Sequence, residues 1–128
     1  MLFARILLAV QAVVLAGCGL AYFIRPQEMV NLSGMLLMEA AAITDVRAYY
    51  GALQLGLAVF LLLATVRLEL TRAALTLLVL LYAALAFGRI AGLWLDGGLQ
   101  QTFNLYLLLF EVVSVGLAFM ALRGLSRA

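Results

Sequence analysis

Three ionisable side chains interrupt or border stretches of sequence that are otherwise apolar. Arg89 and Glu111 each stand inside such a stretch, and Arg47 stands just before another. A charge inside a hydrocarbon layer is costly unless it is paired or hydrated, so these residues are the first place to look for function. An arginine can pair with a carboxylate of the protein, or it can bind a carboxylate or phosphate group of a ligand.

The depth of each charge decides whether the three can meet. Arg89 lies six residues before Leu95, about 9 Å from that end of its helix. Glu111 lies eight residues after Phe103, about 12 Å from the corresponding end of the next helix. Arg47 enters from the same side at a shallower level. We therefore predict one polar cluster that contains Arg47, Arg89 and Glu111.

Further polar residues share a helical face with these charges, because residues seven apart lie on the same side of an α-helix. Three helices thus carry one polar stripe each, and the stripes are buried best when they face one another. The predicted ligand-binding pocket is lined by Arg47, Tyr50, Gln54, Tyr82, Arg89, Asp96, Asn104, Glu111 and Ser114. The first apolar stretch offers only Gln11, so we expect that helix to be peripheral.

Two interpretations of this cluster remain open. An Arg–Glu pair can simply hold two helices in register. Alternatively, two arginines against one deep glutamate leave a spare positive charge, which Asp45, Asp96 or an anionic ligand could neutralise.

The elements that must position these residues are membrane-spanning helices. The chain has 128 residues, 68% hydrophobic and 11% charged, whereas soluble domains are about 45–50% apolar and about 25% charged. Four stretches reach the roughly 20 apolar residues that a spanning helix needs. We predict a single all-α domain over 1–128, a four-transmembrane-helix bundle with helices over about 4–24, 46–66, 73–95 and 103–122.

The helix boundaries have local signals. Pro26 disfavours helix at Arg25 and ends the first span, and the sequence Asp96-Gly97-Gly98 ends the third. The connection over 26–45 is long and contains Met35-Leu36-Leu37-Met38. It is too short to span and too apolar to be free in water. We interpret it as an outer interfacial or re-entrant segment, or as an apolar connector packed on the helices.

Arginine counts orient the bundle. Five arginines flank the spans on one side, namely Arg5, Arg67, Arg72, Arg123 and Arg127. The positive-inside rule makes that side, with both chain termini, cytoplasmic. The opposite side gathers an aromatic belt of Tyr22, Phe23, Tyr49, Tyr50, Trp94, Phe103 and Tyr106.

Small residues also recur at helical spacing. Ala48, Ala52 and Gly56 are four apart, as are Ala84, Gly88 and Gly92. Such ridges let helices approach closely in lipid, either within one chain or between protomers.

Several chemistries lack their usual residues. The sequence has no His, and Cys18 is its only cysteine, so we expect no disulfide, no metal site and no cofactor. The arginines are scattered, which argues against nucleic-acid binding. The segment Leu15-Ala16-Gly17-Cys18 is also typical of a bacterial lipoprotein signal. Because the apolar run continues through Ile24, we interpret Cys18 as a small buried residue, with lipidation as the alternative.

Three segments together resemble a known family. They are DVRAYYGALQLGLAVFLLL at 45–63, GRIAGLWLDG at 88–97 and FEVV at 110–113. They are similar to an uncharacterised bacterial family of short four-helix inner-membrane proteins, a domain of unknown function. The resemblance implies a multi-pass protein of the bacterial inner (cytoplasmic) membrane and brings no activity with it. The family-type positions are Arg47, Tyr50, Gly51, Arg89, Gly92, Asp96 and Glu111.

Three functions are compatible with the sequence. The first is a non-catalytic membrane protein that binds an anionic amphiphile in the outer polar pocket. The second is a structural or scaffold subunit of a larger membrane complex, as a homo-oligomer or with another membrane protein. The third is an intramembrane lipid-modifying enzyme that uses Glu111 as its acid or base. An Arg–aromatic–Gly helix start also resembles the sterol-synthesis scaffold proteins of eukaryotes, by analogy alone.

Overall fold

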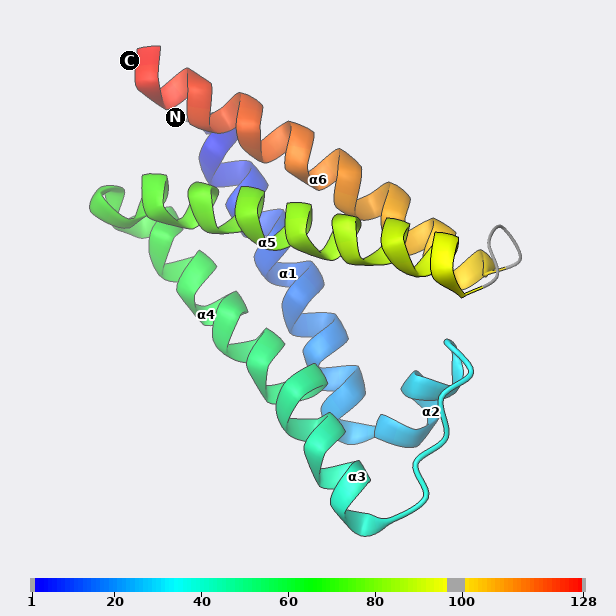
Figure 1. Cartoon of the computed structure of the whole chain (residues 1–128). Coiled ribbons are helices and arrows are strands. Elements are labelled where there is room, and N and C mark those ends of the chain that lie inside the picture. The colour runs from blue at the N-terminus through cyan, green and yellow to red at the C-terminus, as the bar shows by residue number, and fades with distance from the viewer. Residues whose placement is uncertain (1, 97–100, 128) are drawn as a thin grey trace.

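A computed structural model of the protein describes residues 2–96 and 101–127, and these residues form helices without any strand. The elements in chain order are α1 Leu2–Ile24, α2 Pro26–Asn31, α3 Ala40–Val46, the π-helix η1 Arg47–Ala52, α4 Leu53–Val66, α5 Leu68–Leu95 and α6 Thr102–Arg127 (Figure 1). Gly97 and Gly98, predicted to end the third helix, lie outside the described residues.

Four of the helical stretches are long and apolar enough to cross a membrane. They are Leu2–Ile24, Ala40–Val66, Leu68–Leu95 and Thr102–Leu125. The shortest has 23 residues and is about 35 Å long at 1.5 Å per residue, which exceeds the roughly 30 Å of a bilayer core. The chain is therefore a multi-pass membrane protein with four spanning helices, which confirms the fold predicted from the sequence.

Three helix boundaries differ from the predicted ones. The second span begins at Ala40, as α3, rather than at 46. The third begins at Leu68 rather than at 73, because only Arg67 separates α4 from α5. The fourth continues to Arg127 rather than to 122. Hydropathy locates the apolar part of a helix, whereas these helices extend into their polar flanks.

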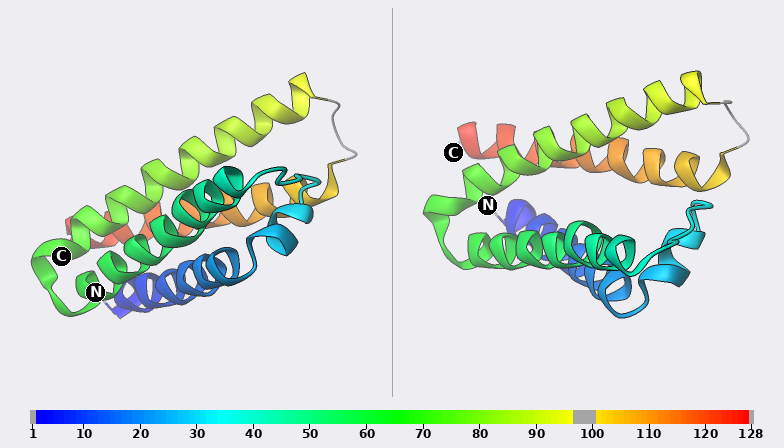
Figure 2. Two further views of the ribbon diagram at one scale, coloured as in Figure 1. Left: turned by 90° about the horizontal axis from the view of Figure 1, so that it is seen from below. Right: turned by 60° about the horizontal axis from the view of Figure 1, so that its bottom comes forward.

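The four spans pack as two pairs, α1 with α4 and α5 with α6 (Figures 1 and 2). The pairs meet where the two chain termini and the α4–α5 turn lie, which we call the convergent end (Figure 1). They separate toward the other end, the divergent end, where α2 and α3 lie (Figure 1). Most of each pair's surface therefore faces its surroundings rather than the other pair.

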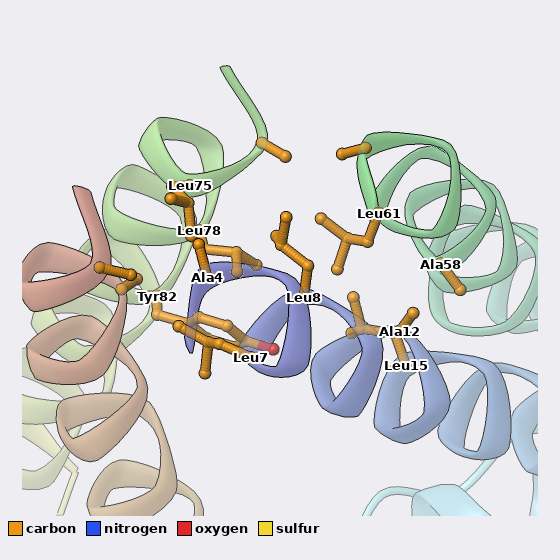
Figure 3. Close-up of a cluster of buried hydrophobic side chains, with 14 residues drawn as sticks. Ala4, Leu7, Leu8, Ala12, Leu15, Ala58, Leu61, Leu75, Leu78 and Tyr82 are labelled. Carbon is orange, nitrogen blue, oxygen red and sulfur yellow. The ribbon is translucent and has the colours of Figure 1, made fainter. Parts of the chain in front are cut away.

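The buried core joins the two pairs at the convergent end. Its fully buried large side chains include Leu8 of α1, Leu61 of α4, and Leu75 and Leu78 of α5. Leu8 points between the α4 and α5 residues (Figure 3). The rest of the cluster is Ala4, Leu7, Ala12, Leu15, Ala58, Ala64, Ala74, Tyr82, Ala118 and Ala121. Many of its members are alanines, and small residues let helices approach closely in lipid.

The turn at Arg67 fixes the convergent end. The Thr71 hydroxyl donates a hydrogen bond to the Ala64 carbonyl (2.9 Å), which ties the start of α5 to the end of α4. Arg5 of α1 donates from Nε to the Thr65 carbonyl (3.0 Å). Three spanning helices are thus joined by hydrogen bonds within a few residues of one turn.

The connection over 26–45 contains two short helices. Pro26 occupies the first turn of α2, where its missing N–H costs nothing. Gly34 follows α2 with φ of 83°, a left-handed conformation that suits glycine. Met35, Leu36 and Met38 are exposed. The apolar residues that suggested an interfacial segment are thus outside the core, at the divergent end (Figure 1).

Glycines bring α1 and η1 into close contact. A Cβ on Gly51 would lie 3.0 Å from the Phe23 nitrogen, and a Cβ on Gly19 would lie 2.8 Å from the Gly51 carbonyl oxygen. Backbone atoms cannot move aside as a flexible side chain can. Close approach therefore accounts for glycine at both positions.

Gly51→Ala is expected to lower the free energy of unfolding by about 1–3 kcal/mol, because overpacking forces the two backbones apart. The matched control is Gly56→Ala in the same span, where an added Cβ meets nothing within 4 Å. Unfolding of both variants in detergent micelles measures the difference. Equal stability of the two variants would contradict the close packing.

Candidate functional site

Arg89 and Glu111 form an ion pair between α5 and α6. The Arg89 Nε lies 2.9 Å from both Glu111 carboxylate oxygens. The Glu111 side chain is 4% exposed and that of Arg89 is 25% exposed. The predicted meeting of these two charges from adjacent helices is therefore present, with the acid buried and the base half-buried.

The polar contacts continue from this pair toward the divergent end. The Arg89 Nη1 donates to the Asn104 amide oxygen (2.7 Å), and the Asn104 amide nitrogen donates to Gln101 (2.7 Å). Gln101 in turn donates to the Asp96 carbonyl (3.3 Å). Asp96 itself is exposed. The chain of amides thus connects a buried charge to the end of the bundle.

An open depression adjoins the outer end of these contacts. It has a volume of ≈ 460 Å³ and is lined by Leu32, Ser33, Asp96, Gln101, Thr102, Phe103 and Asn104. The segment after α2 therefore borders the same place as the start of α6.

A second set of hydrogen bonds lies deeper and joins three helices. The Tyr82 hydroxyl of α5 donates to the Gln11 amide oxygen of α1 (2.6 Å). The Gln11 amide nitrogen donates to the Ser114 hydroxyl of α6 (3.0 Å). All three side chains are buried, and Tyr82 is also packed edge-on against Phe110. Gln11, expected at the periphery, therefore joins α1 to the polar site.

The face of α1 that carries Gln11 continues along the space between the pairs. Cys18 lies seven residues after Gln11, and Tyr22 lies four residues after Cys18, which keeps all three on one side of the helix. Tyr22 lies close enough to Arg89 to interact with it electrostatically. Tyr82 lies close enough to Cys18 and Glu111 to do the same. Cys18 is exposed rather than buried, which corrects its expected role as a buried residue.

The core and the Gln11 hydrogen bonds join the two pairs of helices at one level. Beyond that level α1 presents Cys18 and Tyr22, while α5 and α6 present Arg89 and Glu111. We call this region the interpair site, and it is defined by Cys18, Tyr22, Tyr82, Arg89 and Glu111.

The predicted stripe of the second span does not reach the interpair site. Arg47 is exposed and borders a separate depression of ≈ 430 Å³ with Ile24, Arg25, Pro26, Gln27, Glu28 and Ile43. The Gln54 amide donates to the Tyr50 carbonyl of its own helix (2.6 Å). Only Tyr50 approaches, through its ring contact with Tyr22 at 5.3 Å. The cause is the divergence of the pairs, which leaves η1 against α1 rather than α5.

The two ridges of small residues lie outside the core. Ala48, Ala52 and Gly56 are exposed, and so are Ala84 and Gly88. Gly56 and Gly88 face open space, since a Cβ added at either position would meet no atom within 4 Å. Gly56 and Gly88 therefore make no close helix contact within the described chain.

The Arg89 guanidinium and the Glu111 carboxylate are each engaged by the other at this site. Both carboxylate oxygens of Glu111 already accept from Arg89. Among the described residues, no group of three His, Cys, Asp or Glu side chains could hold a metal ion. A guanidinium can donate further hydrogen bonds to a polar group beside it.

Comparisons with known proteins place the chain in one family. Searches of curated proteins and of solved structures found no match. The model of one family matches residues 3–122, which is nearly the whole chain, and the family is described as a domain of unknown function. On this evidence the chain belongs to the family Domain of unknown function (DUF4345).

Proposed function

We propose that this protein binds an amphiphile in the interpair site, without catalysing a reaction on it. The polar head group contacts Arg89, and the apolar tail lies beside Cys18 between α1 and the α5–α6 pair. Glu111 and Asn104 orient the guanidinium, and Tyr22 and Tyr82 complete the interpair site.

One observation carries this proposal. Arg89 has five N–H donors, of which Nε contacts Glu111 and Nη1 contacts Asn104. Nη2 makes no hydrogen bond with the described part of the chain. An arginine whose side chain is one-quarter exposed within a spanning helix needs a partner for its remaining donors. A lipid-like molecule would supply an acceptor for the remaining Arg89 donors and an apolar tail between α1 and the α5–α6 pair.

The proposal predicts that blocking the tail space removes the ligand. Cys18→Trp fills the interpair site without touching its hydrogen bonds. Native mass spectrometry of the protein in a mild detergent is expected to show a co-purifying amphiphile on the wild type and at most about a tenth of it on the variant. A tenfold change corresponds to about 1.4 kcal/mol, less than the burial of two methylene groups.

The matched control is Val13→Trp. Val13 is 69% exposed and lies on the opposite side of α1 from Cys18, so its replacement should leave the ligand in place. No bound amphiphile on wild type, or equal occupancy in both variants, would refute the proposal.

We also propose that the convergent end is cytoplasmic and that the membrane is the bacterial inner membrane. Arg5, Arg67, Arg72 and Arg123 flank the spans at that end, against Arg25 and Arg47 at the other. The bias follows the positive-inside rule. A reporter fused to the carboxyl terminus that is active only in the cytoplasm tests this orientation, and periplasmic activity of a matched reporter would reverse it.

A scaffold or structural subunit is the second candidate function. Its support is the exposure of both small-residue ridges, which are suited to helix–helix contact in lipid. Gly88→Ile is expected to abolish cross-linking to a second copy or to a membrane partner if the ridge is an interface. Unchanged cross-linking, or its absence in wild type, would remove this candidate. The enzymatic hypothesis gains no support, because Glu111 is held by Arg89.

A further inference from the structure

The charge balance of the interpair site determines which head group it can hold. Arg89 is its cation and Glu111 is its anion, and they are in direct contact. Arg47, which was expected to add a second positive charge, borders a different depression beside Arg25 and Glu28. The nearest further acid along α5 is Asp96. The described side chains around Arg89 therefore supply no excess positive charge.

We infer that the head group is an uncharged hydrogen-bond acceptor, such as an ester carbonyl or a hydroxyl, rather than a phosphate or carboxylate. This inference rests on the proposed function and names the chemical class of its ligand. Nη2 of Arg89 donates to the acceptor oxygen, while Glu111 keeps the site neutral. The Arg89–Glu111 pair has no net charge, so the guanidinium can donate a strong hydrogen bond while the site has no net attraction for an anion.

An anionic head group is disfavoured by electrostatic repulsion and by the loss of its hydration. An anion placed at Nη2 lies close to the Glu111 carboxylate, which is nearly fully buried and has no second cation beside it among the described residues. Like charges in a medium of low dielectric repel strongly. An anion would also lose its hydration on entering the space between helices. A neutral carbonyl or hydroxyl has neither cost and still satisfies the free donor.

The site becomes an anion site when its own anion is removed. Glu111→Gln keeps an amide oxygen that can accept from Arg89 Nε, and it leaves a net charge of about +1. Arg89 is one-quarter exposed, so part of its charge can be hydrated in the variant. Glu111→Gln is therefore expected to change the preferred head group from uncharged to anionic while the shape of the site changes little.

The probes are 1-monooleoylglycerol and its phosphate ester, which share one acyl chain and differ by the charged group. Delipidated protein in neutral detergent is titrated with each, and occupancy is measured by native mass spectrometry. The wild type is expected to bind the uncharged lipid at least about tenfold more tightly. Glu111→Gln is expected to reverse the order, because the uncompensated Arg89 cation then forms a charge-assisted hydrogen bond with the phosphate.

The controls separate this inference from the proposed function. Arg47→Gln should change neither affinity, since Arg47 lies outside the site. Tighter binding of the phosphate ester by wild type would overturn the inference and leave amphiphile binding intact. Binding of neither lipid by wild type, together with no co-purifying amphiphile, would overturn both. If Glu111→Gln does not fold, Arg89→Gln combined with Glu111→Gln keeps the site neutral and should weaken uncharged-lipid binding alone.

Discussion

Arg89→Leu is expected to destabilise the protein by about 3–5 kcal/mol, the largest effect of any single substitution at the site. The change leaves the Glu111 carboxylate at 4% exposure without its partner, and an unpaired buried charge is strongly unfavourable. Reversible unfolding in mixed micelles, followed by circular dichroism, measures the loss.

The two partners are not equivalent, and the converse change is expected to cost less. Glu111→Leu leaves an Arg89 side chain that is 25% exposed and still donates to Asn104, so part of its charge can be hydrated. Arg89→Leu with Glu111→Leu should recover most of the lost stability, because well-packed apolar residues often replace a buried pair without cost. A double-mutant cycle gives the coupling energy. Equal costs for the two single changes would contradict the assigned burial.

Gln11→Leu is expected to lower the free energy of unfolding by about 2–6 kcal/mol. It leaves the Tyr82 hydroxyl without an acceptor and the Ser114 hydroxyl without a donor, and each buried unsatisfied group costs about 1–3 kcal/mol. Because these bonds join α1 to α5 and α6, the loss should appear as weakened contact between the pairs. Thermal unfolding in micelles and cross-linking between α1 and α6 report the two effects.

The matched control is Gln54→Leu, whose amide bonds only its own helix. It should change stability by less than about 1 kcal/mol, the net value of one exposed hydrogen bond. Restoration of stability by adding Tyr82→Phe and Ser114→Ala to Gln11→Leu would confirm that the cost lies in unpaired groups. A Gln11→Leu variant as stable as wild type would show that the hydrogen bonds contribute nothing to the fold.

The sequence predicted the α5–α6 part of the site well. Arg89, Glu111 and Asn104 lie on regular α-helices joined by a short connection, so spacing gives the faces and distance from the helix ends gives the depth. An apolar helix hairpin with one acid and one base at the same level has few ways to bury both. The four spans were predicted for a similar reason, since their length and hydropathy are set by the bilayer.

The sequence did not predict the part of the site that depends on which helices touch. Arg47 and Gln54 share a face only if the helix between them is regular, but η1 over Arg47–Ala52 is a π-helix, whose wider turns change the spacing. Gln11 had no periodic partner and looked unimportant. The sequence signal for its role was that Gln11, Cys18 and Tyr22 share one face of α1. That face could be assigned to the site only once α1 was seen to contact α5 and α6 through Gln11.

The single-residue turn at Arg67 is a possible hinge between the two pairs of helices. Helices joined by one residue have little room to slide past each other, so we expect relative motion at the far end to be rotation about this turn. The 28 residues of α5 form an arm about 42 Å long, and a tilt of about 5° moves its tip by about 4 Å. A change in side-chain volume at this turn, far from any bound molecule, is therefore expected to change the separation of the two pairs at the divergent end.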